Sequence, residues 1–147
     1  MSATTSRVSP KGDTRRLLYF LKRDRVKSRI YGMPAEMAKE EGHRALDRVL
    51  AAGGMPKSLS TELRWFVGDV AAALAAGQGE SLAFDLEGIL AKWEHLGLEP
   101  NTMHLLLRIV CQDVGGIELP QPVERAQHRV RPARPAPKPK EADDGQA

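Results

Sequence analysis

The sequence predicts an all-α protein: a compact bundle of about five short helices followed by a disordered, Pro/Arg-rich C-terminal tail. Three observations indicate this fold. Good helix formers (Ala, Leu, Glu and Arg) dominate the 147 residues. No stretch shows the alternation of β-branched and polar residues that is typical of strands. Glycines interrupt the chain at intervals that suit short helices.

The first helix is expected to run from Asp13 to Tyr31. Asp13 is a favourable N-terminal cap, and Gly32 supplies a C-terminal break. We expect Phe20 to be buried, because aromatic rings at helical spacing usually belong to a core. The apolar stripe of this helix is expected to consist of Leu18, Tyr19, Phe20 or Leu21, Val26 and Ile30.

The second helix is expected to begin at Pro34 and to stop at Gly53. Proline suits a first helical turn because its missing N–H has no partner there in any case. Gly42 should weaken the middle of this helix by up to about 1 kcal/mol relative to alanine. Its apolar face is expected to be Ala38, Ala45, Leu46, Val49 and Leu50.

The third helix carries the strongest helical signal, because its apolar residues recur at spacings of three and four. Ser60 is its expected cap, and Gly77 should end it. The repeating apolar residues are Leu59, Leu63, Phe66, Val67, Val70 and Leu74.

The fourth helix is expected to begin with Ser81 as its cap. Gly97 should take the left-handed conformation after it, Leu98 should pack back on it, and Pro100 should prevent its continuation. Its buried stripe is expected to be Leu82, Leu86, Ile89, Leu90 and Trp93.

The fifth helix, "TMHLLLRIVCQDV", is expected to begin at Asn101 and to stop at Gly115. It is apolar nearly all round, so we place it at the centre of the bundle. Short connections predict antiparallel hairpins between helices three and four and between helices four and five.

The composition divides the chain into a flexible N-terminus (1–12), a helical domain (13–117) and a disordered, basic, proline-rich tail (118–147). Six of the ten prolines lie between positions 120 and 139. The start of the chain lacks an apolar signal core, and no apolar run is long enough for a bilayer. A single cysteine excludes an intramolecular disulfide, so we expect a cytoplasmic location and no membrane contact.

No pattern in the chain indicates an enzyme. "GQGES" at 77–81 lacks the Lys-Ser/Thr of a phosphate-binding loop. Cys111 and His104 are two helical turns apart, about 10 Å, so we expect a buried, inert thiol and an ordinary surface histidine. The histidines and the cysteine show no metal-ligand spacing. We therefore expect no catalytic residue, no metal and no cofactor.

Charge is unevenly distributed, although the net charge is only +3. Residues 1–56 contain twelve Lys/Arg and six Asp/Glu, whereas residues 57–117 contain four and eight. Like charges in one helix repel unless an anion neutralises them. We therefore expect the basic first helix to contact the phosphates of RNA or DNA without reading bases. The expected binding residues are Arg15, Arg16, Lys22, Arg23, Arg25, Lys27 and Arg29.

The sequence leaves two functions open. The first is a non-catalytic accessory subunit that contacts nucleic-acid backbone, or a nucleoprotein assembly, through this helix. The alternative is a structural or adaptor protein that makes only protein contacts through the same helix and tail, in a homo- or hetero-oligomer. A membrane-surface helix fits less well, because the cations are expected to ring the helix. The apolar fifth helix is unsuited to reading a major groove.

Overall fold

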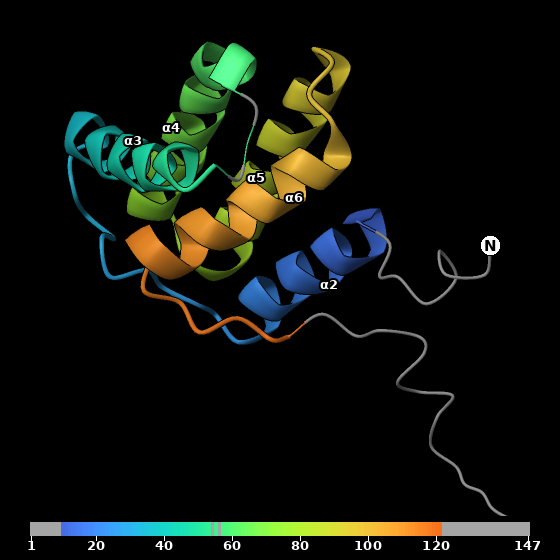
Figure 1. Cartoon of the computed structure of the whole chain (residues 1–147). Coiled ribbons are helices and arrows are strands. Elements are labelled where there is room, and N and C mark those ends of the chain that lie inside the picture. The colour runs from blue at the N-terminus through green and yellow to red at the C-terminus, as the bar shows by residue number, and fades with distance from the viewer. Residues whose placement is uncertain (1–9, 54, 56, 122–147) are drawn as a thin grey trace, which may run out of the picture. The chain divides into compact units, whose positions relative to one another are not determined.

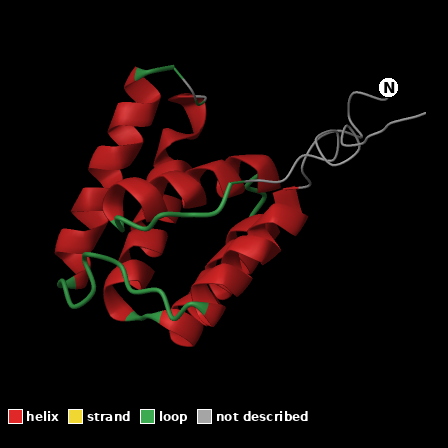
Figure 2. Cartoon of the chain, turned by 90° about the horizontal axis from the view of Figure 1, so that it is seen from below, coloured by secondary structure: helices red, strands yellow, loops and turns green. Residues whose placement is uncertain are grey.

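Helices joined by short loops make up the part of the chain that the structure describes. The computed structural model describes residues 10–53, 55 and 57–121, and in these ranges the chain forms five α-helices and no strand (Figures 1 and 2). This confirms the predicted all-α class. One compact unit spans Pro10–Pro120, so the predicted domain limits of 13 and 117 fall inside it. Most of the predicted flexible N-terminus (1–9) and of the predicted tail (from 122) lies outside the described residues.

The helices follow one another with short connections (Figure 1). A 3₁₀ turn precedes α4, and a turn of π-helix continues α6. Their bounds are α2 Pro10–Arg23, α3 Ala35–Ala51, the 3₁₀ turn η1 Lys57–Leu59, α4 Ser60–Ala76, α5 Gly79–His95, α6 Pro100–Ile109 and the π-helical turn η2 Val110–Val114.

Helices α3 and α4 form the closest helix pair and run antiparallel. A Cβ atom added to Gly42 would lie 2.9 Å from the carbonyl oxygen of Val67 and 3.1 Å from the Cβ of Ala71. Gly42 was expected only to weaken its helix. Instead it allows two backbones to approach, which a larger residue would prevent.

The apolar stripe predicted for the third helix is confirmed except at its first member. Leu63, Phe66, Val67, Val70 and Leu74 are fully buried in α4. The first member, Leu59, is exposed, because it lies in the 3₁₀ turn and not in the helix.

The predicted hairpin of helices three and four is confirmed for α4 and α5. Asp69 of α4 accepts a hydrogen bond from Trp93 Nε1 (2.9 Å), and the buried Trp93 ring meets Phe66 edge to face, with the centroids 6.4 Å apart. Helix α5 begins two residues before Ser81. The prediction that Ser81 is the N-cap is wrong, because Gln78 occupies that position; the Ser81 hydroxyl accepts the backbone N–H of Gln78 (3.2 Å) from the third position of the helix.

The fifth predicted helix lies in the core, as expected. Leu106, Leu107, Val110 and Cys111 are fully buried. Gly97 adopts φ 99°, as predicted for the connection before it. The predicted antiparallel packing of α6 on α5 is wrong, because α6 packs instead against α2 and α4. The short connection holds only the ends of the two helices close together.

The first helix differs most from the prediction. It begins at Pro10, which suits a first turn, and ends at Arg23, eight residues before Tyr31. Arg25 follows in the left-handed region (φ 53°), and the N–H of Val26 donates to the carbonyl of Leu21 (3.0 Å). A left-handed residue at the C-terminal end of a helix is normally glycine, so an arginine at this position does not indicate a helix end.

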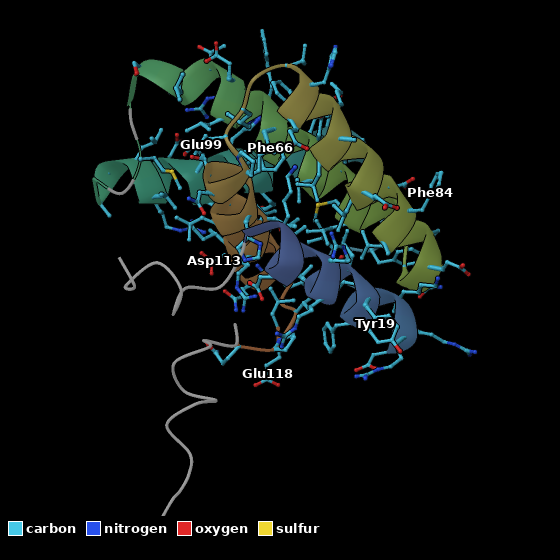
Figure 3. The ribbon with its side chains drawn as sticks, turned by 90° about the vertical axis from the view of Figure 1, so that its right-hand side faces the viewer. Tyr19, Phe66, Phe84, Glu99, Asp113 and Glu118 are labelled. Atoms are coloured by element: carbon cyan, nitrogen blue, oxygen red, sulfur yellow. The ribbon has the colours of Figure 1, made fainter. Side chains whose placement is uncertain are left out.

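The early end of α2 changes its apolar stripe. Leu17 and Leu21 are its buried residues, and Phe20 is only half-buried. Tyr19, placed on the stripe by the sequence, is 61% exposed (Figure 3). Ile30 is buried, as expected, but it lies in the loop after the helix.

Candidate nucleic-acid interface

The exposed side of α2 carries four of the seven predicted binding residues. At about 100° per residue, they fall with Tyr19 in an arc of about 120° on the side opposite the buried Leu17 and Leu21. The prediction that cations ring the helix is therefore wrong, because Arg25, Lys27 and Arg29 are not helical. We call this surface the cationic face; its residues are Arg15, Arg16, Tyr19, Lys22 and Arg23.

The C-terminal end of the cationic face opens into a groove of about 630 Å³. Lys22, Arg23 and Arg25 line it together with Tyr19, with Gln78 and with the first two residues of α5, Gly79 and Glu80. We call it the cationic groove. The N-terminus of a helix adds partial positive charge through its free N–H groups. Four sources of positive charge and one exposed ring therefore meet at one place.

Gly79 allows α2 and α5 to meet at this groove. Its φ is 56°, and an added Cβ atom would lie 3.3 Å from the Cα of Arg25. Its N–H donates to the carbonyl of Val26 (2.8 Å). The backbone after α2 is thereby fixed against the start of α5, and the fixed backbone directs Arg25 toward the groove.

Two cations of the groove have carboxylate partners. Lys22 lies 3.8 Å from Glu80, and Arg23 donates to Asp24 at 2.8 Å. The hydrogen bond and charge of Asp24 raise the pKa of Arg23. All four side chains are exposed, so these pairs contribute little to stability and are easily exchanged for another anion.

Other cations have no such partner. Within residues 10–53, 55 and 57–121, Arg15, Arg16 and Arg25 form no ion pair with a carboxylate. Lys27 lies over the ring of Tyr31, with its Nζ 5.7 Å from the ring centre. The repulsion predicted from the sequence is thus compensated only in part by the fold.

Arg29 lies apart from the groove. Its side chain donates to the carbonyl oxygens of Val114 (2.9 Å) and Asp113 (3.1 Å), at the end of η2. A cation stabilises the C-terminal end of a helix, where carbonyl groups lack partners. A phosphate would have to compete with these bonds for Arg29.

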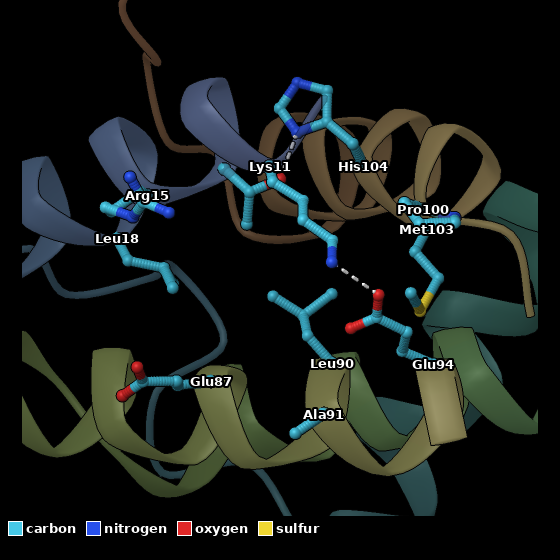
Figure 4. Close-up of a pocket in the computed structure, with 11 residues that line it drawn as sticks. Lys11, Arg15, Leu18, Glu87, Leu90, Ala91, Glu94, Pro100, Met103 and His104 are labelled. Carbon is cyan, nitrogen blue, oxygen red and sulfur yellow. Dashed lines mark hydrogen bonds and ion pairs between the residues drawn. The ribbon is translucent and has the colours of Figure 1, made fainter. Parts of the chain in front are cut away.

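A second hollow lies at the other end of α2, against α5 and the start of α6 (Figure 4). This side pocket has a volume of about 240 Å³. Lys11 reaches across it from α2 to pair with Glu94 of α5 at 2.9 Å. Apolar side chains form much of its wall, and its lining includes Arg15, Leu18, Glu87, Leu90, Met103 and His104.

A buried polar cluster ties α2 to α6 beside the side pocket. His104 Nε2 lies 2.5 Å from Asp13 Oδ2, a short contact that is not aligned as a hydrogen bond, and its Nδ1 is 2.8 Å from the Thr14 hydroxyl. Arg108 Nη1 approaches the same Asp13 oxygen at 3.5 Å. Two predictions are therefore wrong: Asp13 is not a helix cap, and His104, with a side chain only 13% exposed, is not a surface residue.

Burial determines the proton affinity of two groups in this region. Desolvation lowers the pKa of His104, although the neighbouring Asp13 opposes that change. Burial raises the pKa of the Cys111 thiol to about 12. The thiol therefore stays protonated at neutral pH, and the prediction that it is buried is confirmed.

The polar cluster and the side pocket could not be predicted from the sequence, because their members are distant in the chain. Thr14 and His104 are separated by 90 positions. In the part of the chain that the structure describes, no three His, Cys, Asp or Glu side chains are arranged to hold a metal ion. Nor does any described helix combine the length and the apolar character needed to cross a membrane.

Comparisons with protein-family models, curated proteins and solved structures found no match to this chain.

Proposed function

We propose that this protein is a non-catalytic accessory subunit that contacts nucleic-acid backbone, alone or in a nucleoprotein assembly, through the cationic face and the cationic groove. One observation carries the proposal: Lys22, Arg23 and Arg25 converge on a single groove at the N-terminus of α5. Guanidinium and ammonium groups bind phosphate through charge-assisted hydrogen bonds, and a helix N-terminus favours the same ligand.

Tyr19 adds a contact that a phosphate ion alone would not use. Its ring is exposed in the middle of the cationic face, and the guanidinium carbon of Arg23 lies 5.7 Å from its centre. Base–aromatic stacking contributes about 1–3 kcal/mol per base in single-strand binding proteins. The face is thus suited to a single strand, with its backbone on the cations and one base on Tyr19.

The affinity for a short single-stranded oligonucleotide, measured over a salt series, tests this proposal. With about four phosphates neutralised, the slope of log affinity against log salt should be about −3. Raising salt from about 50 to 200 mM should then weaken binding about fiftyfold. An affinity that does not change with salt, or no binding at the lowest salt, would contradict the proposal.

A pair of variants locates the binding surface. The double variant Arg23→Gln and Arg25→Gln should make the salt slope shallower by roughly 1 to 2, because two phosphate contacts are removed. The control is Arg44→Gln with Arg48→Gln, which makes the same change in charge on the exposed side of α3. Equal effects of the two variants would indicate a general charge effect instead of a defined site.

The alternative function, an adaptor that contacts only proteins, is favoured by a different observation. Three large apolar side chains are exposed on α4 and α5 and at the end of α5: Trp65 (61%), Phe84 (74%) and Leu96 (61%). Figure 3 shows Phe84 pointing outward from α5. Trp65 and Leu96 line one groove of about 510 Å³. Exposed aromatic residues of this kind often anchor protein partners.

Sedimentation of the purified chain tests this alternative. Self-association that is lost in Trp65→Ala would favour the adaptor. A monomer that binds oligonucleotides with the expected salt slope would favour the nucleic-acid interface.

A further inference from the structure

We propose that the side pocket takes one unpaired guanine base from a single strand whose backbone lies along the cationic face. This inference rests on the proposed function and adds a base preference to it. Four features of the pocket support it: its position, its wall, its size and its free carboxylate.

The side pocket adjoins the cationic face, because Arg15 belongs to both. Arg15, Tyr19 and Lys22 follow one another at spacings of four and three along α2, so they form a single stripe. The stripe from Arg15 to Lys22 spans seven residues, about 10 Å. A strand bound in the cationic groove and stacked on Tyr19 is therefore led to the side pocket.

The wall and the size of the pocket suit a flat ring. Leu18 comes from α2, Leu90 from α5 and Met103 from α6, so apolar side chains of three helices face the hollow (Figure 4). Its volume of about 240 Å³ is below the range of about 300–1,000 Å³ typical of sites for drug-sized ligands. One ring system fits this size better than a whole nucleotide.

Two carboxylates and two cations line this pocket, whereas the cationic groove has three cations and one carboxylate. Glu94 is paired with Lys11, whereas the exposed side chain of Glu87 forms no ion pair or hydrogen bond with any other residue that the structure describes. Arg15 attracts a phosphate and the unpaired Glu87 repels it, so the phosphate lies near Arg15 and the base enters. A carboxylate only accepts hydrogen bonds. The base must therefore present donors to Glu87.

Guanine presents the edge that fits Glu87 best. Its ring N1–H and its 2-amino group are adjacent donors, and together they match the two oxygens of one carboxylate. Adenine and cytosine each offer one amino group on this edge, and thymine or uracil offers one ring N–H. Unpaired bases are recognised on these Watson–Crick edges. The geometry therefore points to guanine before the other bases.

The test compares three short single strands bound to the full chain, with binding measured by fluorescence anisotropy. The first is an all-thymidine strand, the second carries one central guanosine, and the third carries inosine at the same place. The guanosine strand should bind at least about fivefold more tightly than the thymidine strand, as expected for one bidentate base contact. Inosine keeps N1–H but lacks the 2-amino group, so its strand should fall between the two.

Glu87→Gln should remove the preference for guanosine and leave the affinity for the thymidine strand unchanged or slightly higher. The matched control is Asp85→Asn, which removes one exposed carboxylate from the same helix but outside the side pocket. Both positions are exposed, so both variants should fold, and thermal unfolding verifies this.

Each outcome decides the inference. Salt-dependent binding without a guanosine preference would overturn it while leaving the proposed function intact. A guanosine preference that persists in Glu87→Gln would show that the base binds elsewhere, and would overturn the assignment to this pocket. Failure of every strand to bind at low salt would overturn the proposed function as well.

Discussion

Two helix contacts in this molecule differ in their physical basis: the contact of α3 with α4, and the contact of α2 with α5 and α6. The α3–α4 contact is close and mostly apolar: Gly42 lets the backbone of Val67 approach, and Ala45 and Leu46 are buried beside it. Helix α2 buries Leu17 and Leu21, but it also places Asp13 in a buried polar cluster.

Exposed ion pairs join α2 to α5 at both ends of α2, Lys11–Glu94 and Lys22–Glu80. Exposed pairs of this kind are weakened by salt, and a buried histidine responds to pH. Apolar close packing responds to neither. Helices α3 and α4 share one exposed pair, Arg64–Asp47, whereas α2 has two such pairs and a buried histidine at its contacts. The docking of α2 should therefore depend more on solution conditions, and the four predictions below test that difference.

The largest effect is expected for Leu21→Ala in α2. Leu21 is fully buried, so its truncation should lower the free energy of unfolding by about 2–5 kcal/mol. Urea denaturation measures this loss. Amide hydrogen exchange should show faster opening of α2 than of α4. Equal acceleration in both helices would mean that α2 docks as firmly as α3.

Gly42→Val tests the opposite side of the comparison. Its Cβ atom would lie 2.9 Å from a main-chain oxygen, so the two helices must move apart at a cost of about 1–3 kcal/mol. Urea denaturation also measures this loss. The control is Gly88→Ala on α5, where no atom lies within 4 Å of an added Cβ and the helix should gain up to about 1 kcal/mol. A neutral Gly42→Val would show that the α3–α4 contact is looser than we describe.

A smaller effect is expected for Arg29→Gln. Loss of the bonds to Val114 and Asp113 should cost up to about 1 kcal/mol of stability. Its oligonucleotide affinity should change less than that of Arg16→Gln, which removes a cation with no carboxylate partner among the described residues. Arg16→Gln should leave stability nearly unchanged. The reverse pattern would place Arg29 in the binding site and contradict the role given to it by the structure.

The smallest effect concerns pH. Burial lowers the pKa of His104 below its ordinary value of 6.5, so the unfolded chain takes up a proton more readily than the folded chain. The stability due to neutral His104 is therefore present above pH 6.5 and is lost as pH falls below it toward the lowered pKa. Asp13 offsets part of the loss, because it attracts the protonated ring.

Thermal unfolding from about pH 7.5 to about pH 5.5 measures this effect. His104→Gln should show a shallower fall in melting temperature than the native chain over that interval. An identical pH profile in the variant would assign the fall to other histidines.

Local patterns in the sequence were sufficient to predict core residues of α4, α5 and α6. A face repeated at three and four residues must be buried wherever the helix packs, so Leu63, Leu86 and Leu106 could be assigned to the core without knowledge of their partners. Gly97 could likewise be assigned to a left-handed turn, because few other residues adopt that conformation without cost.

The end of α2 and the composition of both candidate sites were decided only by tertiary contacts. Arg25 adopts a glycine-like conformation because Gly79 and the carbonyl of Val26 hold the backbone there, and no residue in the sequence signals it. That turn decides which cations share a face and leaves Arg29 outside it. Asp13 and His104 meet for the same reason: their contact depends on how α2 and α6 pack, which neither local segment specifies.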